Sequence, residues 1–105
     1  MTSQTLALLA VLMSDPAREW YGFEAGDVAG IKSGTLYPAL ARLERARWLS
    51  SHWEEVDPRV AGRPRRRLYR LTQDGAAFAR EELDAQVARL TIRTPKTLRP
   101  HGGIA

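Results

Sequence analysis

Cysteine is absent from this sequence of 105 residues, and histidine occurs only as His52 and His101. The lack of cysteine excludes disulfide frameworks, thiolate metal sites and thiol nucleophiles. So few histidines also argue against a histidine-built metal site. No glycine-rich phosphate loop is present, and neither histidine has a catalytic partner at a useful spacing. We therefore expect neither a metal nor a cofactor, and an enzyme is the least favoured class.

Long apolar runs are missing too. The longest, from Leu6 to Met13, has eight residues, whereas a helix that spans a bilayer needs roughly 20. The residues before that run carry no basic side chain, which a secretory signal would require. These features predict a cytoplasmic protein of one domain, and chains of this small size are often completed by oligomerisation.

Charges are unevenly distributed, although their sum is only +4. Residues 1–30 carry one base and four acids, whereas residues 31–70 carry ten bases and four acids. The densest stretch runs from Arg59 to Arg70 and holds six arginines with no acid among them. Clustered arginine suits a surface that binds a polyanion, because each neutralised phosphate releases condensed counterions. The alternative is a solvated loop.

Three helices are predicted in the first half of the chain. Apolar residues fill all sides of the segment from about Thr5 to Met13, which is typical of a helix covered on more than one side. A short helix from about Phe23 to Ala29 should end at Gly30. A third helix, roughly 35–47, places three leucines on one face toward the core. These are Leu36, Leu40 and Leu43.

Pro38 sets the expected start of the third helix. Because proline has no N–H, it is harmless in a first turn, so the helix should begin near Thr35. Ser33 or Thr35 would then cap the free backbone donors. Arg42 and Arg45 lie with Thr35 and Pro38 on the face away from the leucines. The amino end of such a helix can meet a phosphate directly, and a plain solvated face is the alternative.

Alternating residues after Trp48 indicate two strands, Leu49–Val56 and Arg66–Leu71. The segment between them is rich in turn formers and completes a hairpin with an arginine-rich tip. Three helices followed by such a hairpin is the order of a winged helix-turn-helix, whose third helix enters the major groove of DNA. The sequence therefore predicts an α+β, mainly α, fold with a two-stranded wing over residues 1–71.

The last predicted helix follows Thr72, a good cap, and ends near Arg93 before Pro95. At roughly 30 Å it would be longer than the winged domain can cover. Residues 72–93 should therefore pack with that domain and also form a dimer; packing along its own domain alone is the alternative. The prolines and glycines of residues 94–105 predict a flexible tail. The main apolar stripe of the helix is Ala76, Ala79, Leu83, Val87 and Leu90.

Five segments carry a further signal that composition cannot supply. They are Leu6–Leu9, Tyr21–Glu24, Ser33–Glu44, Gly62–Arg66 and Leu68–Thr72. The third contains Gly-Thr-Leu-Tyr-Pro-Ala-Leu, and Gly-Arg-Pro and Tyr-Arg-Leu-Thr follow downstream. Together these segments resemble the PadR family of transcriptional regulators, in the short subfamily with a single C-terminal dimerisation helix.

The resemblance implies a winged-helix homodimer that binds a palindromic operator in double-stranded DNA. It also implies a repressor that a small molecule or another signal releases. Two positions depart from the family. Ala46-Arg47-Trp48 stands where a glycine commonly precedes the first wing strand. Phe78 is the only aromatic residue of the last helix, whereas short multidrug-binding members have a tryptophan there, so drug binding is not carried over.

The resemblance and side-chain chemistry together predict the contact residues. On the recognition helix, Lys32, Ser33 and Tyr37 suit phosphates, Thr35 and Arg42 can reach base edges, and Pro38 offers apolar contact. In the wing, Arg63, Arg65 and Arg66 suit phosphates or the minor groove. Arg67 and Arg70 are alternatively expected to pair with Glu54 or Glu55. The expected dimer contacts are Leu6, Leu9, Met13, Leu83, Val87 and Leu90.

Two expectations remain open beside this reading. Trp20, Trp48 and Trp53 are expected as core or hinge aromatics rather than as platforms for an effector. A winged helix that binds RNA or another protein is the alternative function, although no exposed aromatic sheet motif for stacking bases is evident. Preference for a palindromic duplex over RNA would separate the two functions.

Overall fold

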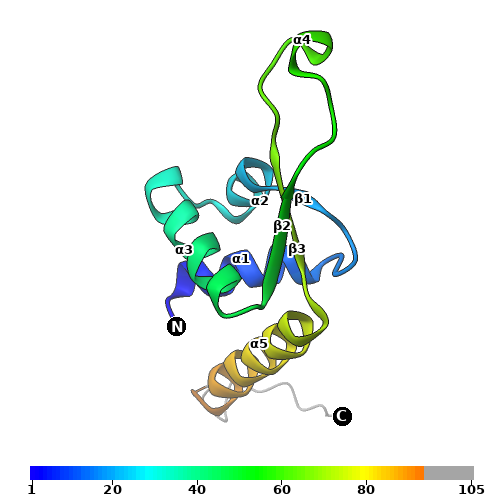
Figure 1. Ribbon diagram of the computed structural model, residues 1–105. Coiled ribbons are helices and arrows are strands. Elements are labelled where there is room, and N and C mark those ends of the chain that lie inside the picture. The colour runs from blue at the N-terminus through cyan, green and yellow to red at the C-terminus, as the bar shows by residue number, and fades with distance from the viewer. Residues whose placement is uncertain (94–105) are drawn as a thin grey trace, which may run out of the picture.

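The computed structural model describes residues 1–93 as a mainly helical protein with one small antiparallel sheet. The predicted fold class is thereby confirmed. The predicted flexible tail, 94–105, lies outside the described residues. None of the described helices is long and apolar enough to cross a membrane. Figure 1 shows α1 (Ser3–Met13), β1 (Trp20–Tyr21), α2 (Gly22–Ala29), α3 (Ser33–Arg45), β2 (Leu49–Trp53), α4 (Pro58–Ala61), β3 (Arg67–Leu71) and α5 (Gln73–Arg93).

The sheet has three strands in the order β1-β3-β2, all antiparallel neighbours. In the wing hairpin Leu49 is opposite Leu71, and Trp53 is opposite Arg67. On the other edge of β3, Trp20 pairs with Tyr69. The predicted two-stranded wing is therefore confirmed as the hairpin of β2 and β3, and the short strand β1, which was not predicted, extends the sheet. Two residues are too few to show alternation, so only the tertiary pairing with β3 defines β1.

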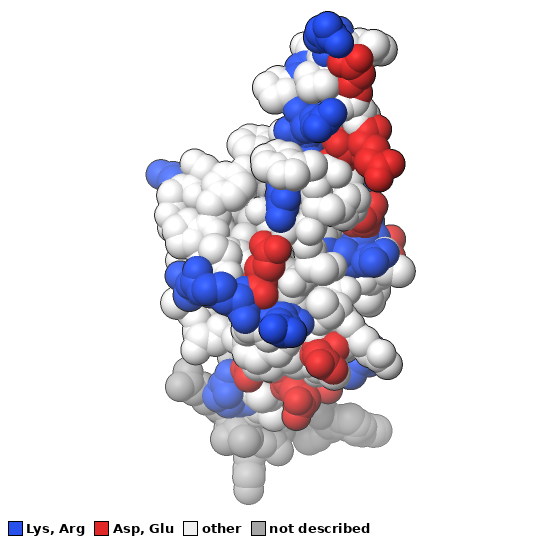
Figure 2. All heavy atoms as spheres, viewed as in Figure 1, with Lys and Arg blue, Asp and Glu red and all other residues white. Residues whose placement is uncertain are grey.

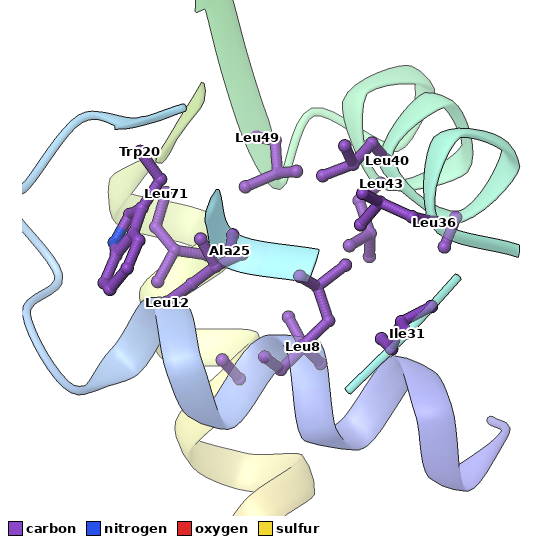
Figure 3. Close-up of a cluster of buried hydrophobic side chains, with 13 residues drawn as sticks. Leu8, Leu12, Trp20, Ala25, Ile31, Leu36, Leu40, Leu43, Leu49 and Leu71 are labelled. Carbon is purple, nitrogen blue, oxygen red and sulfur yellow. The ribbon is translucent and has the colours of Figure 1, made fainter. Parts of the chain in front are cut away.

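Thirteen side chains from the helices and strands form one core (Figure 3). Leu36, Leu40 and Leu43 point into it from α3 and are at most 4% exposed, which confirms their predicted direction. Each such buried leucine stabilises the fold by about 1.5–3 kcal/mol. They meet Leu8 of α1 and Leu49 of β2, so the core fixes α3 against the base of the wing.

Helix α1 lies behind the sheet and contacts α2, α5 and β3. Contact on several sides explains why its sequence is apolar all round, as predicted. One consequence corrects an expectation: Leu9 is 0% exposed in the core of its own chain and cannot touch a second copy. Leu6 and Met13 are only partly buried.

Helix α3 passes into β2 through Arg47, whose backbone is left-handed at φ 65°. The N–H of Arg47 donates to the carbonyl of Glu44, and the N–H of Trp48 donates to that of Leu43. These two bonds form a Schellman motif, which usually places glycine at the left-handed residue. The chain therefore makes this turn with arginine at the left-handed position that glycine usually takes.

The amino end of α5 is capped by a side chain of the protein itself. The Thr72 hydroxyl accepts a bond from the N–H of Gly75 (2.9 Å) and donates one to the Arg47 carbonyl (2.8 Å). The predicted cap is thus confirmed. A Cβ on Gly75 would lie 1.8 Å from the carbonyl oxygen of Trp48, so only glycine permits this approach. From there α5 leads away from the winged domain (Figure 1).

Candidate nucleic-acid interface

The outer face of α3 brings the predicted recognition residues together. All six residues are exposed, and α3 lies at the edge of the molecule beside the base of the wing (Figure 1). Figure 2 shows basic atoms near both ends of α3 with an uncharged stretch between them. Such a surface can face an anionic groove with cations at its two limits. The six are Lys32, Ser33, Thr35, Tyr37, Pro38 and Arg42.

The amino end of α3 is open. Lys32 is the N-cap residue and makes no side-chain cap bond, so the predicted capping by Ser33 or Thr35 is wrong. Within residues 1–93 the backbone N–H groups of Ser33 and Gly34 have no hydrogen-bond partner. A Cβ on Gly34 would meet no atom within 4 Å. Free donors at the positive end of a helix dipole form a site for an anion such as phosphate.

Pro38 lies in the second turn of α3, because the helix begins at Ser33 rather than near Thr35. Proline removes the hydrogen bond to the carbonyl four residues earlier, which here belongs to Gly34. Gly34 is exposed, so water can satisfy that carbonyl. The expectation that Pro38 marks the first turn fails for this reason.

Arg63 is held by the wing itself. Its guanidinium forms an ion pair with Glu54, whose carboxylate also accepts a bond from the N–H of Arg66 (3.0 Å). The pair raises the pKa of Arg63 and lowers the pKa of Glu54 below its usual 4.5. Because the folded pKa of Glu54 is depressed, this stabilisation is present above pH 4.5 and is lost as the pH falls through the lower folded value. Arg63, which was predicted to contact phosphate or the minor groove, thus pairs with an acid within the wing.

Among the described residues, Arg65 and Arg66 form no ion pair with an acid, in contrast to Arg63. Arg65 is exposed and uses its Nε for one bond to the Val56 carbonyl (2.9 Å). The guanidinium carbon of Arg66 lies 4.4 Å from the ring centroid of Tyr21, a cation–π contact that orients it beside α2. Both predicted wing cations therefore stay available at the side of the wing.

Arg67 joins the base of the wing to α3. It lies 3.9 Å from the carboxylate of Glu44 and donates from Nε to the Ser51 hydroxyl (3.0 Å). Ser51 in turn donates to Glu44 (2.5 Å). Arg67 was expected to pair with Glu54 or Glu55, but it lies beside Glu44 instead, and Arg63 takes the carboxylate of Glu54. The network fixes the wing relative to the recognition helix.

The tip of the wing is a single helical turn, α4, rather than an irregular turn. Asp57 caps it by accepting from the N–H of Arg59 (2.9 Å). The turn presents Arg59, whose side chain is 93% exposed, and Val60, which is 86% exposed. Arg59 was not among the predicted contacts. The Asp-Pro start and the glycine five residues after Asp57 are the sequence signals of this turn.

The three tryptophans have different surroundings. Trp20 is 5% exposed in the core. Trp48 stacks on Phe78 with ring centroids 3.5 Å apart, at the junction of α3, β2 and α5. Trp53 is 57% exposed at the end of β2, where Arg67 lies over its ring. A core or hinge position fits Trp20 and Trp48, whereas Trp53 is at the surface.

Known structures share this architecture. The chain is similar to a PadR family transcription regulator from Clostridium difficile R20291, with 25% identity, a TM-score of 0.65, and coverage of 88% of this chain and 93% of that chain. A PadR-like transcription factor from Bacteroides fragilis has 30% identity and a TM-score of 0.61 over 83% and 82% of the two chains.

A third similar structure is the PcaV transcriptional regulator from Streptomyces coelicolor in complex with its natural ligand, with 26% identity and a TM-score of 0.66. That alignment covers 87% of this chain and 58% of the other, so this chain spans about three fifths of the PcaV length. No curated protein sequence matches the chain.

The sequence itself identifies the family. Residues 15–81 match the model of the transcriptional regulator PadR-like family. The match covers the two helices α2 and α3, the wing and the start of α5, and it confirms the resemblance of the motifs. It also agrees with the expectation of a DNA-binding regulator rather than an enzyme. The chain belongs to the PadR-like family of transcriptional regulators.

Proposed function

We propose that the chain binds a palindromic operator as a homodimer and represses transcription until an effector releases it. The observation that carries the DNA contact is the open amino end of α3, on a helix whose Tyr37 lines a hollow together with Arg65 and Arg66 of the wing. A protein that used this helix only for its own packing would gain by capping it. The open end is instead free for a phosphate of DNA.

In this proposal α3 enters the major groove. The N–H groups of Ser33 and Gly34, with Lys32 and Tyr37, bind phosphates at the edge of the groove. Thr35, Pro38 and Arg42 are on the exposed side of the helix, where they reach base edges or a thymine methyl group. Together these positions separate phosphate contacts at the helix start from base contacts along its length.

The wing follows the adjacent backbone or minor groove. Arg65 and Arg66 supply cations along its side, and Arg59, which lies 3.7 Å from the Asp57 carboxylate but is 93% exposed, supplies one at the tip. Arg63 acts by positioning the strands through Glu54. Each arginine that neutralises a phosphate adds about 0.9 to the slope of the salt dependence of binding.

The dimer would form through α5. Ala79 is enclosed by its own domain, whereas Leu83 is half-buried and Val87 and Leu90 are 62% and 57% exposed. Apolar side chains that become more exposed along one helix suit contact with a second copy. Leu6 and Met13, partly buried on α1, complete the proposed contact, without Leu9. Val87→Asp should yield a monomer by light scattering; a surviving dimer would refute this interface.

Release by a small molecule is supported by a relative. The similar PcaV regulator was solved with its natural ligand.

The test is a binding titration against duplex DNA from the region upstream of the protein's own gene. A scrambled duplex and an RNA hairpin serve as competitors. We expect saturable binding of two subunits per site that falls steeply with salt. Equal competition by the RNA would favour the alternative of an RNA-binding winged helix, and no preference over scrambled DNA would overturn operator recognition.

Two wing variants sharpen the test. Arg65→Ala should lower the salt slope by about one, because a phosphate contact is lost. Arg63→Ala should weaken binding through a disordered wing, which circular dichroism and melting would show. A larger change of slope for Arg63→Ala than for Arg65→Ala would reverse these assignments.

A further inference from the structure

Arg47, in the turn after α3, is the only residue other than glycine with a positive φ among residues 1–93. This left-handed conformation strains an L-residue, and glycine would adopt it freely. The backbone of Arg47 is held on both sides. Its N–H donates to the Glu44 carbonyl (2.9 Å), and its own carbonyl accepts from the Thr72 hydroxyl (2.8 Å). The surrounding structure therefore imposes a strained conformation on an arginine.

The side chain of Arg47 has no role inside the described part of the chain that would offset this strain. It is exposed, and its guanidinium forms no ion pair, hydrogen bond or ring contact within residues 1–93. Glu44, three residues earlier, is already engaged by Arg67 and Ser51. Strained backbone conformations are concentrated at functional sites. Arg47 is therefore a candidate for contact with something outside the chain.

A second guanidinium without a partner lies two residues earlier. Arg45 is exposed in the last turn of α3 and, like Arg47, makes no side-chain interaction among residues 1–93. Figure 2 shows basic atoms over this end of the helix. Cations in the last turn of a helix are stabilised by its dipole, which accounts for Arg42 and Arg45. The dipole does not account for a third cation that follows in a strained conformation.

The two ends of α3 are far enough apart to face different strands of DNA. From Ser33 to Arg45 the helix rises by roughly 18 Å, whereas the major groove of B-DNA is about 12 Å wide. A helix that crosses this groove with its amino end at one backbone therefore has its carboxyl end at the other. That end carries the exposed guanidiniums of Arg45 and Arg47.

We propose that Arg45 and Arg47 bind a phosphate of the operator strand opposite the strand that the amino end of α3 binds; this inference rests on the proposed function. Helix α3 is then held at both ends, by backbone N–H groups at one and by guanidiniums at the other. The base contacts lie between them. Because two hydrogen bonds fix the backbone of Arg47, less conformational freedom is lost when its side chain binds.

The salt dependence of duplex binding tests the contact. Arg47→Gly should lower the slope by about 0.9 and weaken binding about eightfold at 0.1 M salt, because one phosphate contact is lost. Arg47→Lys keeps the charge and should keep the wild-type slope. An unchanged slope in Arg47→Gly would overturn the proposal. Melting and light scattering should show a folded dimer, and a monomeric Arg47→Gly would assign the arginine to the subunit interface and overturn the proposal too.

Arg70→Ala is the matched control. Arg70 is also exposed, and its side chain has no partner among residues 1–93. It lies three residues after Arg67 in β3, so it is on the opposite face of the sheet from the side chain that contacts α3. The slope of Arg70→Ala should equal that of the wild type. An equal fall in Arg70→Ala and Arg47→Gly would reduce the effect to net charge and overturn the specific contact.

Duplexes with a single methylphosphonate locate the phosphate, because each lacks one backbone charge. The position that weakens binding of the wild type but not of Arg47→Gly marks the contact of Arg47. The position that loses its effect in Ser33→Asp marks the contact of the amino end. We expect the two positions on opposite strands, and two positions on the same strand would overturn the proposal.

A scrambled duplex separates this contact from operator recognition, since a phosphate contact does not depend on base sequence. If the wild type shows no preference for the operator while Arg47→Gly lowers the slope on both duplexes, the proposed function fails and the contact stands. If the wild type prefers the operator and Arg47→Gly keeps its slope, the contact fails and the proposed function stands.

Discussion

The first backbone N–H groups of α3 and of α5 have no hydrogen-bond partner within their own helices. The two amino ends differ in how far the rest of the chain supplies partners for these groups. At α5, Thr72 caps a backbone N–H, Asp74 places an acid in the first turn, and Gly75 packs against the Trp48 carbonyl. At α3, no side chain caps the helix, the first turn has no acid, and Gly34 faces open space. The protein satisfies the backbone donors of one helix end internally and leaves those of the other end without a side-chain cap.

The comparison shows that glycine near the start of a helix can have two different roles. Gly75 permits packing within the chain, whereas Gly34 leaves room for something outside it. An open helix end forgoes about 0.5–2 kcal/mol that a cap contributes. Such a loss is expected at a site whose donors must stay available to phosphate.

The largest effect should come from Gly75→Ala. The new Cβ would overlap the backbone oxygen of Trp48, so α5 must shift from the sheet, and the free energy of unfolding should fall by about 3 kcal/mol. Urea unfolding at one fixed protein concentration measures it. Gly34→Ala is the control and should change stability by less than about 1 kcal/mol. Equal stability of the two variants would contradict the packing of α5.

A smaller loss is expected for Thr72→Val. This substitution keeps the side-chain shape but removes the cap of α5 and the bond to the Arg47 carbonyl, so stability should fall by about 1–2 kcal/mol. Thr72→Ser retains the hydroxyl and should stay close to the wild type. A loss in Thr72→Ser as large as in Thr72→Val would assign the effect to the methyl group instead.

Ser33→Asp and Gln73→Asp place the same negative charge in the first turn of each helix. Each should stabilise the fold by about 0.3–1 kcal/mol through the helix dipole. Only Ser33→Asp should weaken binding to the operator duplex, about tenfold or more, because the carboxylate occupies the donors and repels phosphate. Equal losses of DNA binding in both variants would remove the amino end of α3 from the interface.

The smallest effect concerns the other end of α3. Arg47 has φ 65° where α2 ends with Gly30 at φ 74°, and a left-handed residue other than glycine is strained by about 1–2 kcal/mol. Because glycine also loses more backbone entropy, Arg47→Gly should stabilise the fold by about 0.5 kcal/mol. Differential scanning calorimetry should show a slightly higher Tm. A lower Tm would mean that the Arg47 side chain stabilises the turn.

Periodic segments could be predicted from the sequence. The leucines of α3, the stripe of α5 and its cap at Thr72 all follow from spacing and local hydrogen bonding, which depend on neighbouring residues along the chain. The motifs from Ser33 to Thr72 also identified the family before any contact was known. The order of the elements and the position of α3 could therefore be predicted from the sequence alone.

Features that depend on contacts between residues far apart in the sequence could not be predicted in this way. The strand β1 exists only because two residues pair with β3. Arg63 rather than Arg67 or Arg70 pairs with Glu54, because α4 and the open wing loop bring Arg63 back to that carboxylate. A count of arginines cannot distinguish a paired guanidinium from a free one.

The sequence by itself determined the helices, the hairpin and the basic character of the middle of the chain, since periodicity, turn chemistry and charge are local properties. Only the tertiary structure decided which acid each arginine of the wing pairs with and which helix end is open. The reason is physical: packing determines which polar groups find partners within the chain, and those left over are the ones that can bind DNA or a ligand.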